Sequence, residues 1–346
     1  MSDASDDLPL VSIVVPAHNV SPYIDACLWA IRRQTHSALE VVVVDDGSTD
    51  DSASIAERHA RDDPRIRVVR HETNHGVAVA RNTALERVTG TYVAFADADD
   101  LMDPHLVEIC VAAATRLSAD VVQFTHRPID ADTTSMPCHH GGAGDLTTTD
   151  VTGDAYLRLP AMICCTFVRA SLLSGTKEVF LDRRRFGDKH FHWRLGLAST
   201  SSHHLDEPLF GYRARPGSLT SGRGETRLEL IDSFVDVARL LESEGALAQH
   251  APTLQQKSLE ASWRVLTTIE RPFLAQAVGA ARALSATYVR PHSPGRPTGA
   301  RESLLWALMP WGSAVTRLAF EVLRPVERAL QPHRGPRPAP RRRARW

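Results

Sequence analysis

The first 125 residues alternate between short apolar runs and longer segments with helical spacing, and this alternation limits the fold more than any other feature of the sequence. Strands that alternate with helices of a dozen residues predict right-handed crossovers and a mostly parallel sheet. We therefore expect an α/β fold with a central, Rossmann-like sheet flanked by helices. The expected strands are Val11–Val15, Val41–Val44, Ile66–Val69, Tyr92–Ala96 and Val121–Phe124.

Two of the intervening helices carry a start signal. Ser21-Pro22 and Asp103-Pro104 each place a capping residue directly before a proline. The cap accepts a hydrogen bond from a free N–H group, and proline fits the first helical turn, so helices should begin at these two points. From about Arg127 to Pro160 we expect mainly loop, and after Gly224 the apolar spacing predicts a mainly helical region.

Polar side chains gather where three of the expected strands end. His18-Asn19 follow the first strand, Asp45-Asp46 the second and Asp97-Ala98-Asp99-Asp100 the fourth. Ligands of open parallel sheets bind outside the carboxyl ends of the strands. Three carboxylates in four residues repel one another unless a cation lies nearby, and Mg²⁺ is often held by carboxylates and substrate phosphates. The alternative is an acidic loop or helix cap; we expect a divalent cation, Mg²⁺ or Mn²⁺.

The usual phosphate-binding glycine loops are missing from the sequence. It contains no GxxxxGK[ST] motif and no GxGxxG after the first strand, which disfavours P-loop and dinucleotide-binding folds. Charge neutralisation by a carboxylate-held metal is the remaining common way to bind phosphates. A nucleotidyltransferase would need a glycine-rich, basic loop after the first strand, and 16–20 has neither property.

Composition limits the compartment and the partners. The formal net charge is −1, so nothing in the bulk charge favours nucleic acid, although 331–346 contains six arginines and no acid. Five scattered cysteines form no disulfide framework and fit a reducing compartment. The cluster Cys138-His139-His140 could instead bind a metal.

The acidic 1–7 segment does not resemble a signal peptide, and no apolar run could span a bilayer, so we expect a cytoplasmic protein.

Five short motifs occur in order along the first third of the chain. They are Pro16-Ala17-His18-Asn19, Val44-Asp45-Asp46-Gly47-Ser48-Thr49-Asp50, Asn74-His75-Gly76-Val77, Ala80-Arg81-Asn82 and Asp97-Ala98-Asp99-Asp100. In order and spacing they resemble the motifs of family 2 glycosyltransferases, which have the GT-A fold. The resemblance is close over roughly 9–117 and looser to about 220. It implies inverting transfer of a sugar from a nucleotide-diphospho-sugar to an acceptor hydroxyl, in polysaccharide or glycolipid assembly, with a glycan or lipid-linked acceptor.

The resemblance also implies roles for single residues. Arg81 would lie near the diphosphate, with a surface pair to Glu86 or Asp97 as the alternative. Asp99 would be the principal metal ligand, and Asp97 would contact the ribose or the metal. The remaining assignments are Pro16, Ala17, His18 and Asn19 at the nucleotide, Asp46 at the base, and Asp100 as metal support or turn cap.

The family often supplies its general base from a Glu-Asp pair followed three residues on by an aromatic residue. Here Asp188 occupies the base position and Phe191 the aromatic position, whereas Gly187 replaces the usual Glu. Two alternatives stay open: Asp188 caps the following helix, or it pairs with Lys189. Further on, Arg213 or Arg215 could reach the leaving diphosphate, with a solvated surface pair as the alternative.

Four regions are expected along the chain. They are a flexible 1–8, a catalytic domain 9–222 with a nucleotide-binding half 9–125 and an acceptor half 126–222, a helical 223–330, and a disordered Arg/Pro-rich 331–346. Segment 302–346 either contacts the inner face of a membrane peripherally or packs as a helix before a disordered tail. A non-catalytic nucleotide-sugar or glycan-binding relative is the alternative function, which Gly187 and Lys189 would favour.

Overall fold

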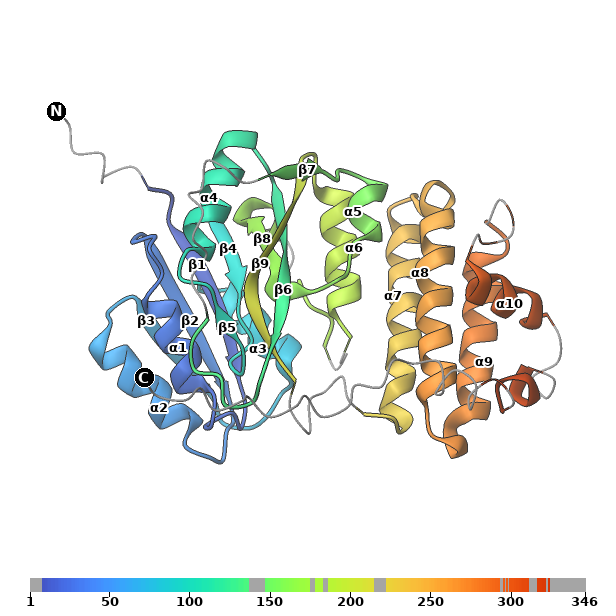
Figure 1. The fold of residues 1–346 in the computed structure, drawn as a ribbon, viewed down its shortest axis with the longest axis horizontal. Coiled ribbons are helices and arrows are strands. Elements are labelled where there is room, and N and C mark those ends of the chain that lie inside the picture. Colours follow the sequence, from blue (N-terminus) through green and yellow to red (C-terminus); the bar gives the residue numbers. More distant parts are fainter. Residues whose placement is uncertain are drawn as a thin grey trace, which may run out of the picture.

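The computed structural model describes residues 8–136, 147–174, 178–182, 186–214, 222–292, 295, 297, 299–310, 316–321 and 323. Within these residues a twisted sheet with helices on both faces is followed by a group of long helices on one side (Figure 1). The expectation of an α/β fold with a central sheet and a helical region after it is confirmed.

The first half of the sheet is the one that the apolar runs predicted. Its strands are β1 (Val11–Ala17), β2 (Leu39–Asp46), β3 (Ile66–His71) and β4 (Tyr92–Phe95), parallel in the order β3-β2-β1-β4. The valines of β2 are buried on both faces, as expected for a central parallel strand. All four strands therefore end at the same edge of the sheet.

Three helices connect these strands, a fourth follows the acidic loop, and two of the four start slightly later than the sequence suggested. They are α1 (Ile24–Arg32), α2 (Ser52–Asp62), α3 (Val77–Leu85) and α4 (Leu106–Leu117). The N-caps of α1 and α4 are Tyr23 and His105, and neither makes a side-chain cap hydrogen bond. The expected caps at Ser21 and Asp103 therefore lie two residues too early, because a short turn precedes each helix. The N–H groups of Tyr23 and Ile24 donate to the carbonyl oxygen of Val20 in that turn.

The second half of the sheet is mixed, which the apolar runs did not predict. β8 (Thr166–Arg169) lies antiparallel between β4 and β6 (Val121–Ile129). β9 (Ser202–Arg213) then runs parallel to β6 and antiparallel to the two-residue strand β5 (Leu101–Met102) and to β7 (Thr148–Asp150). Because β5 directly follows the acidic loop, β9 brings its last residue beside that loop.

The segment expected as loop contains regular structure. β6 continues to Ile129, and β7 and α5 (Asp154–Arg158) follow; 137–146 lies outside the described residues. Beyond Phe124 the side chains of β6 alternate between half-buried and exposed, so this part of the strand lacks the apolar run that marks a buried one.

Two apolar cores hold the sheet, one on each face. The first packs α1, α2 and α4 on the sheet through residues such as Ile24, Leu28 and Leu106. The second includes Phe95, Phe191 and Trp193 and continues into the C-terminal helices. Those helices are α6 (Asp188–Ala198), α7 (Glu229–Ser243), α8 (Leu247–Thr268), α9 (Leu274–Leu284), prolonged by the π-helical 285–289, and α10 (Ala300–Leu308). The sheet and the helices after Gly224 therefore share one core.

Only part of the segment weighed for membrane contact is described, namely 302–310, 316–321 and 323. Leu305, Met309 and Phe320 are buried in the helical group, where Phe320 meets the ring of Trp263 edge-on at 5.3 Å. No helix among the described residues is long and apolar enough to cross a membrane. The Arg-rich 331–346 lies outside the described residues.

Candidate active site

The acidic loop after β4 lies at the shared edge of the parallel strands. Asp97 Oδ1 accepts a hydrogen bond from Arg81 Nη2 at 2.7 Å. Asp100 is buried, and its Oδ1 accepts from the backbone N–H of Arg213 at 2.7 Å. Asp99 is half-buried, and its carbonyl oxygen accepts from Arg213 Nε at 2.6 Å. The end of β9 thus fixes the backbone of the loop and leaves the Asp97 and Asp99 carboxylates partly open to solvent.

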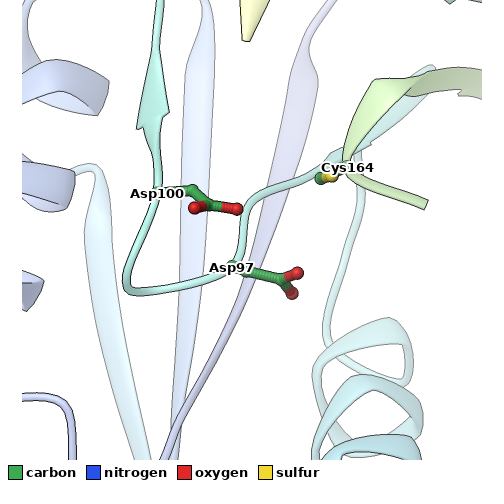
Figure 2. A group of neighbouring side chains, drawn as sticks. All are labelled: Asp97, Asp100 and Cys164. Carbon is green, nitrogen blue, oxygen red and sulfur yellow. The ribbon is translucent and has the colours of Figure 1, made fainter. Parts of the chain in front are cut away.

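The electrostatics of this loop fit a cation. Burial, and then the charges of Asp97 and Asp99, raise the pKa of Asp100 to about 9. Arg81 already pairs with Asp97, and a further cation would offset the repulsion that remains among the three carboxylates. Oxygen atoms of Asp97 and Asp100 and the sulfur of Cys164 lie within 4.8 Å of one another (Figure 2). Asp99, the expected principal ligand, is not in that group, and its metal role stays a prediction.

The sequence did not suggest Cys164 at this site. It belongs to the 3₁₀ turn Ile163–Cys165, which precedes β8 and lies 67 positions along the chain from Asp97. The thiol is buried, and its hydrogen bond with Cys165, together with burial, raises its pKa well above the ordinary value. Cys164 is therefore a neutral neighbour of the carboxylates, and only the pairing of β8 with β4 could have revealed it.

The loops after β1 and β2 are hydrogen-bonded to each other. Pro16 and Ala17 are the last two residues of β1 rather than loop residues. His18 Nδ1 donates to the carbonyl oxygen of Asp46 at 2.8 Å. Asn19 has a positive φ of 49°, and its Oδ1 accepts from the backbone N–H of Thr49 at 2.9 Å. The four residues expected at the nucleotide are thus held next to the end of β2; their contact with a nucleotide stays a prediction.

Asp46, expected at the base, is buried and already makes three hydrogen bonds. Its Oδ1 accepts from His71 Nδ1 at 2.6 Å and from the backbone N–H of His75 at 3.0 Å. Its Oδ2 accepts from the backbone N–H of Gly76 at 2.7 Å. Asp46 therefore shapes the loop before α3, and the sequence alone did not show these partners.

Gly47, the next residue, can only be glycine. Its φ is +66°, and a Cβ atom there would lie 2.5 Å from the carbonyl carbon of Thr73. The close contact lets the loop before α3 pack directly on the end of β2. The glycine in this motif is thus explained by the approach of two backbones.

Arg81 pairs with Asp97, one of the two partners that the sequence suggested for a surface pair, and not with Glu86. Besides donating to Asp97, its guanidinium lies 5.5 Å from the centre of the Phe180 ring, and its side chain is 11% exposed. It is therefore half enclosed rather than on an open helix surface. The next residue, Asn82, exchanges two hydrogen bonds with the backbone of Phe180, at 2.7 and 3.0 Å. Arg81 thus stands at the edge where a diphosphate is expected.

Asp188, the expected general base, is the first residue of α6, and Gly187 is the N-cap. Its Oδ2 accepts from Lys189 Nζ at 2.9 Å, and that Nζ also donates to the carbonyl oxygen of Ala161 at 3.2 Å. Its Oδ1 is buried and has no hydrogen-bond partner within the described part of the chain. Asp188 is thus the first residue of the helix rather than its N-cap, and its role as general base stays a prediction.

Phe191 links this helix to the acidic loop. Its ring stacks on Phe180 at 4.6 Å and meets Phe95 edge-on at 5.4 Å. Phe95 is the last residue of β4, two positions before Asp97. The aromatic contacts therefore place the start of α6 relative to the acidic loop.

Arg213 does not form the solvated surface pair that was one alternative for it, and its contact with a diphosphate stays a prediction. It is 2% exposed, and its guanidinium donates to the carbonyl oxygens of Asp99, Asp130, Ala131 and Thr133 at 2.6 to 2.8 Å. It lies 5.1 Å from the centre of the Tyr23 ring. Arg213 is a buried part of the loop's support, and Arg215 lies outside the described residues.

Comparison with known proteins identifies the family. Residues 12–180 match the model of glycosyl transferase family 2. This range contains the loops after β1, β2 and β4, whereas Asp188 and Arg213 lie beyond it. This part of the chain belongs to that family. The chain is 33% identical over 219 residues to the uncharacterized glycosyltransferase EpsJ of Bacillus subtilis, a match that covers 62% of this chain and 63% of EpsJ. The match thus spans less than two thirds of the length of EpsJ.

Solved structures show the same fold. Residues 1–349 of S. aureus TarS in complex with UDP-GlcNAc superpose with a TM-score of 0.70 at 20% identity, covering 94% of this chain and 93% of TarS. The mannosyltransferase PcManGT of Pyrobaculum calidifontis, in complex with GDP-Man and Mn²⁺, gives a TM-score of 0.50 at 21% identity, covering 93% and 89%. The GT-A fold expected of a family 2 member is thereby shown.

Proposed function

We propose that this protein is a glycosyltransferase that moves a sugar from a nucleotide-diphospho-sugar to an acceptor hydroxyl with inversion. The acidic loop beside Arg81, at the edge of a family 2 sheet, carries the proposal, because it offers sites for a cation and for a diphosphate together. The nucleotide-sugars named in the TarS and PcManGT structures support a donor of this class.

The donor would bind along the ends of β1, β2 and β4. Residues 16–19 and Asp46 would bind the nucleoside, as the family resemblance implies. Arg81 would bind the diphosphate, and to do so its guanidinium would turn from Asp97 to the phosphate oxygens, which bind arginine in two-point contacts. The Asp97 carboxylate would thereby become available to the ribose or to the metal.

Asp97 and Asp99 would hold the divalent cation, Mg²⁺ or Mn²⁺. Burial and the neighbouring charges of Asp97 and Asp99 raise the pKa of Asp100, and this crowding of carboxylates supports a cation at the loop. When bound, a divalent cation offsets charge on the leaving diphosphate. Asp100, buried and tied to β9, would support the loop that carries these ligands.

Asp188 would act as the general base. The free Oδ1 would take the proton from the acceptor hydroxyl while the acceptor oxygen bonds to the anomeric carbon and the bond to the diphosphate breaks. The nucleoside diphosphate leaves with the electron pair of that bond. Lys189 holds the other carboxylate oxygen, and the buried Oδ1 would have to be uncovered as the acceptor binds before it could take the proton.

A ligand-induced melting shift tests the donor class. Nucleotide-sugars with Mn²⁺ should raise the melting temperature according to ln(1 + [L]/Kd), and the strongest shift names the donor. Asp99→Asn should remove the Mn²⁺-dependent part of that shift and lower transfer by about 10³-fold, since it removes a ligand of the charge-offsetting cation. A metal-dependent shift that survives Asp99→Asn would remove Asp99 from the metal site. Donor binding without transfer to any acceptor would instead support the non-catalytic alternative.

The acceptor is proposed to be a glycan or lipid-linked glycan in polysaccharide or glycolipid assembly, at the cytoplasmic side of a membrane. The six arginines in 331–346 support peripheral contact, because basic segments are attracted to anionic lipid surfaces. Flotation of the full chain with phosphatidylserine vesicles, compared with a chain ending at residue 330, tests the contact. Equal flotation of both would remove the role of the basic segment.

A further inference from the structure

A cavity lies apart from the residues expected to bind the donor. Its volume is about 390 Å³, and it is formed by α1, by residues just after the acidic loop, and by the segment that follows β6. α1 contacts β5, and the two elements lie close together in Figure 1. Met102, which lines the cavity, is two residues beyond Asp100. The cavity therefore adjoins the acidic loop without sharing the predicted donor residues.

An exposed tryptophan forms one wall of this cavity. Trp29, on α1, keeps 50% of its surface exposed although it is the largest apolar side chain type. The guanidinium of Arg32 lies over one face of its ring at 4.9 Å from the centre, and His59 meets it edge-on at 6.2 Å. Arg32 is itself held by His59 Nδ1 at 3.3 Å and Asp63 at 3.7 Å. The indole is thus fixed before any ligand arrives, with its other face left uncovered by Arg32.

Polar groups surround the tryptophan within the cavity. Asp25 accepts hydrogen bonds from Arg58 Nη2 at 2.7 Å and His59 Nε2 at 3.1 Å. Burial raises the pKa of the Asp25 carboxyl, but the bonds from His59 and Arg58 outweigh burial, and the pKa lies below its ordinary value. Arg33 also lines the cavity, and no hydrogen bond or ion pair of its side chain occurs among the described residues. The cavity therefore offers a fixed acceptor and an unused donor beside an aromatic face.

This combination suits a sugar ring. A pyranose has an apolar face of C–H groups, which packs on an aromatic ring, and a rim of hydroxyls, which both donate and accept hydrogen bonds. Asp25 can accept from such hydroxyls, and Arg33 can donate to them, as can the hydroxyls of Thr134 and Ser135 at the opposite wall. The volume is that of a small-molecule pocket with a few convergent polar groups, whereas a protein partner needs a broad surface.

We propose that this cavity is a saccharide-binding subsite in which a sugar ring stacks on Trp29. The inference rests on the proposed function for its biological ligand: beside the acidic loop, the subsite would hold a unit of the acceptor glycan away from the reacting hydroxyl. It would lengthen the contact between enzyme and acceptor and so favour acceptors of more than one sugar.

Fluorine NMR on the full chain labelled with 5-fluorotryptophan tests the subsite directly. Trp29→Phe and Trp193→Phe assign two of the resonances. Titration with glucose, galactose, mannose, N-acetylglucosamine and glucuronic acid at millimolar concentrations should shift the Trp29 resonance saturably with at least one sugar. The Trp193 resonance should stay in place, because that side chain is 1% exposed. No shift of Trp29 with any of the five sugars, or an equal shift of Trp193, would overturn the proposal.

Variants then measure the contribution of the ring. Trp29→Ala should weaken binding of the responding sugar, followed by calorimetry, by about tenfold, the usual worth of an aromatic contact. Trp29→Phe should weaken it less. Leu304→Ala removes another exposed apolar side chain, 39% exposed on α10, and should leave the affinity unchanged. Equal affinity of Trp29→Ala and the unaltered chain counts against the subsite.

The same samples separate this inference from the proposed function. Melting shifts with nucleotide-sugars and Mn²⁺ report the donor site, and they should be unchanged in Trp29→Ala, which also shows that the variant is folded. A chain that binds sugar at Trp29 but no nucleotide-sugar contradicts the proposed function and leaves the subsite standing. The reverse result removes the subsite alone.

Discussion

The two halves of the sheet hold their functional side chains in different ways. At the ends of β1, β2 and β4, polar side chains bond across neighbouring loops, as Asn19 does with Thr49, Asp46 with the loop before α3, and Arg81 with Asp97. In the second half, Asp188 bonds to its neighbour Lys189, and packing of Phe191 on β4 sets the place of its helix. The site residues of the first half are therefore organised by hydrogen bonds, and those of the second half by apolar packing.

The largest test of this contrast is Asp188→Asn. We expect transfer to fall by 10²- to 10⁴-fold, the usual contribution of a general base, while donor affinity is unchanged because the donor half is organised independently. Initial-rate assays and donor calorimetry on the same preparation measure both quantities. Normal transfer would return Asp188 to a structural role at the start of α6, and weakened donor binding would break the separation between the halves.

Asp46→Asn tests the hydrogen-bonded half. The amide would turn an N–H group toward one of the donors from His71, His75 or Gly76, so we expect a loss of about 1.5–3 kcal/mol in the free energy of unfolding, the range for hydrogen bonds to a charged group. Denaturant unfolding measures it. Asp51→Asn, at an exposed carboxylate nearby, is the matched control and should change stability little. Equal effects of the two variants would show that the Asp46 bonds do not organise this loop.

His192 gives the packed half a dependence on pH. Burial, with smaller effects of nearby lysines, lowers its pKa to about 3, and its Nε2 donates to the carbonyl oxygen of Tyr156 at 3.0 Å. Because the unfolded chain binds a proton near pH 6.5 and the folded chain does not, this residue destabilises the fold as pH falls below that value. Between pH 7 and 5 it should cost about 2 kcal/mol.

His192→Gln keeps a side-chain amide donor for Tyr156 and does not titrate. Denaturant unfolding at both pH values should therefore show a smaller loss in the variant than in the unaltered chain. The same loss in both would mean that another group controls the acid sensitivity.

Lys189→Met should have the smallest effect on stability. The side chains of the Lys189–Asp188 pair are 22% and 27% exposed, and such pairs contribute about 0–1 kcal/mol. Chemical unfolding should find a change within that range. A loss well above it would show that the bond to Ala161, rather than aromatic packing, holds the start of α6 in place.

The sequence predicts the first half of the fold well because three of its four strands, β1, β2 and β4, are buried on both faces. The run Val41–Val44 can hardly be anything other than a central strand, and parallel strands bring Asp46 and Asp97 to one edge automatically. The second half is harder to predict because β6 alternates beyond Phe124 and β5 has only two residues. Short or half-exposed strands contain no continuous apolar run from which a strand could be predicted.

The same difference explains which site residues were found. Residues inside the motifs were found by resemblance, whereas their partners come from distant positions. Cys164 reaches Asp97 only because β8 runs antiparallel to β4, and Arg213 reaches Asp99 only because β9 pairs with β5. Such contacts depend on strand order, which hydropathy does not encode.

Arg213 has a consequence for how the protein matures. A guanidinium sealed beneath the carboxylates is a permanent counter-charge that belongs to the polypeptide itself. The positive charge of Arg213 therefore offsets part of the repulsion among the loop carboxylates, so the chain can fold without a bound ion. The support of the loop is thus part of the fold itself and does not depend on a bound ligand.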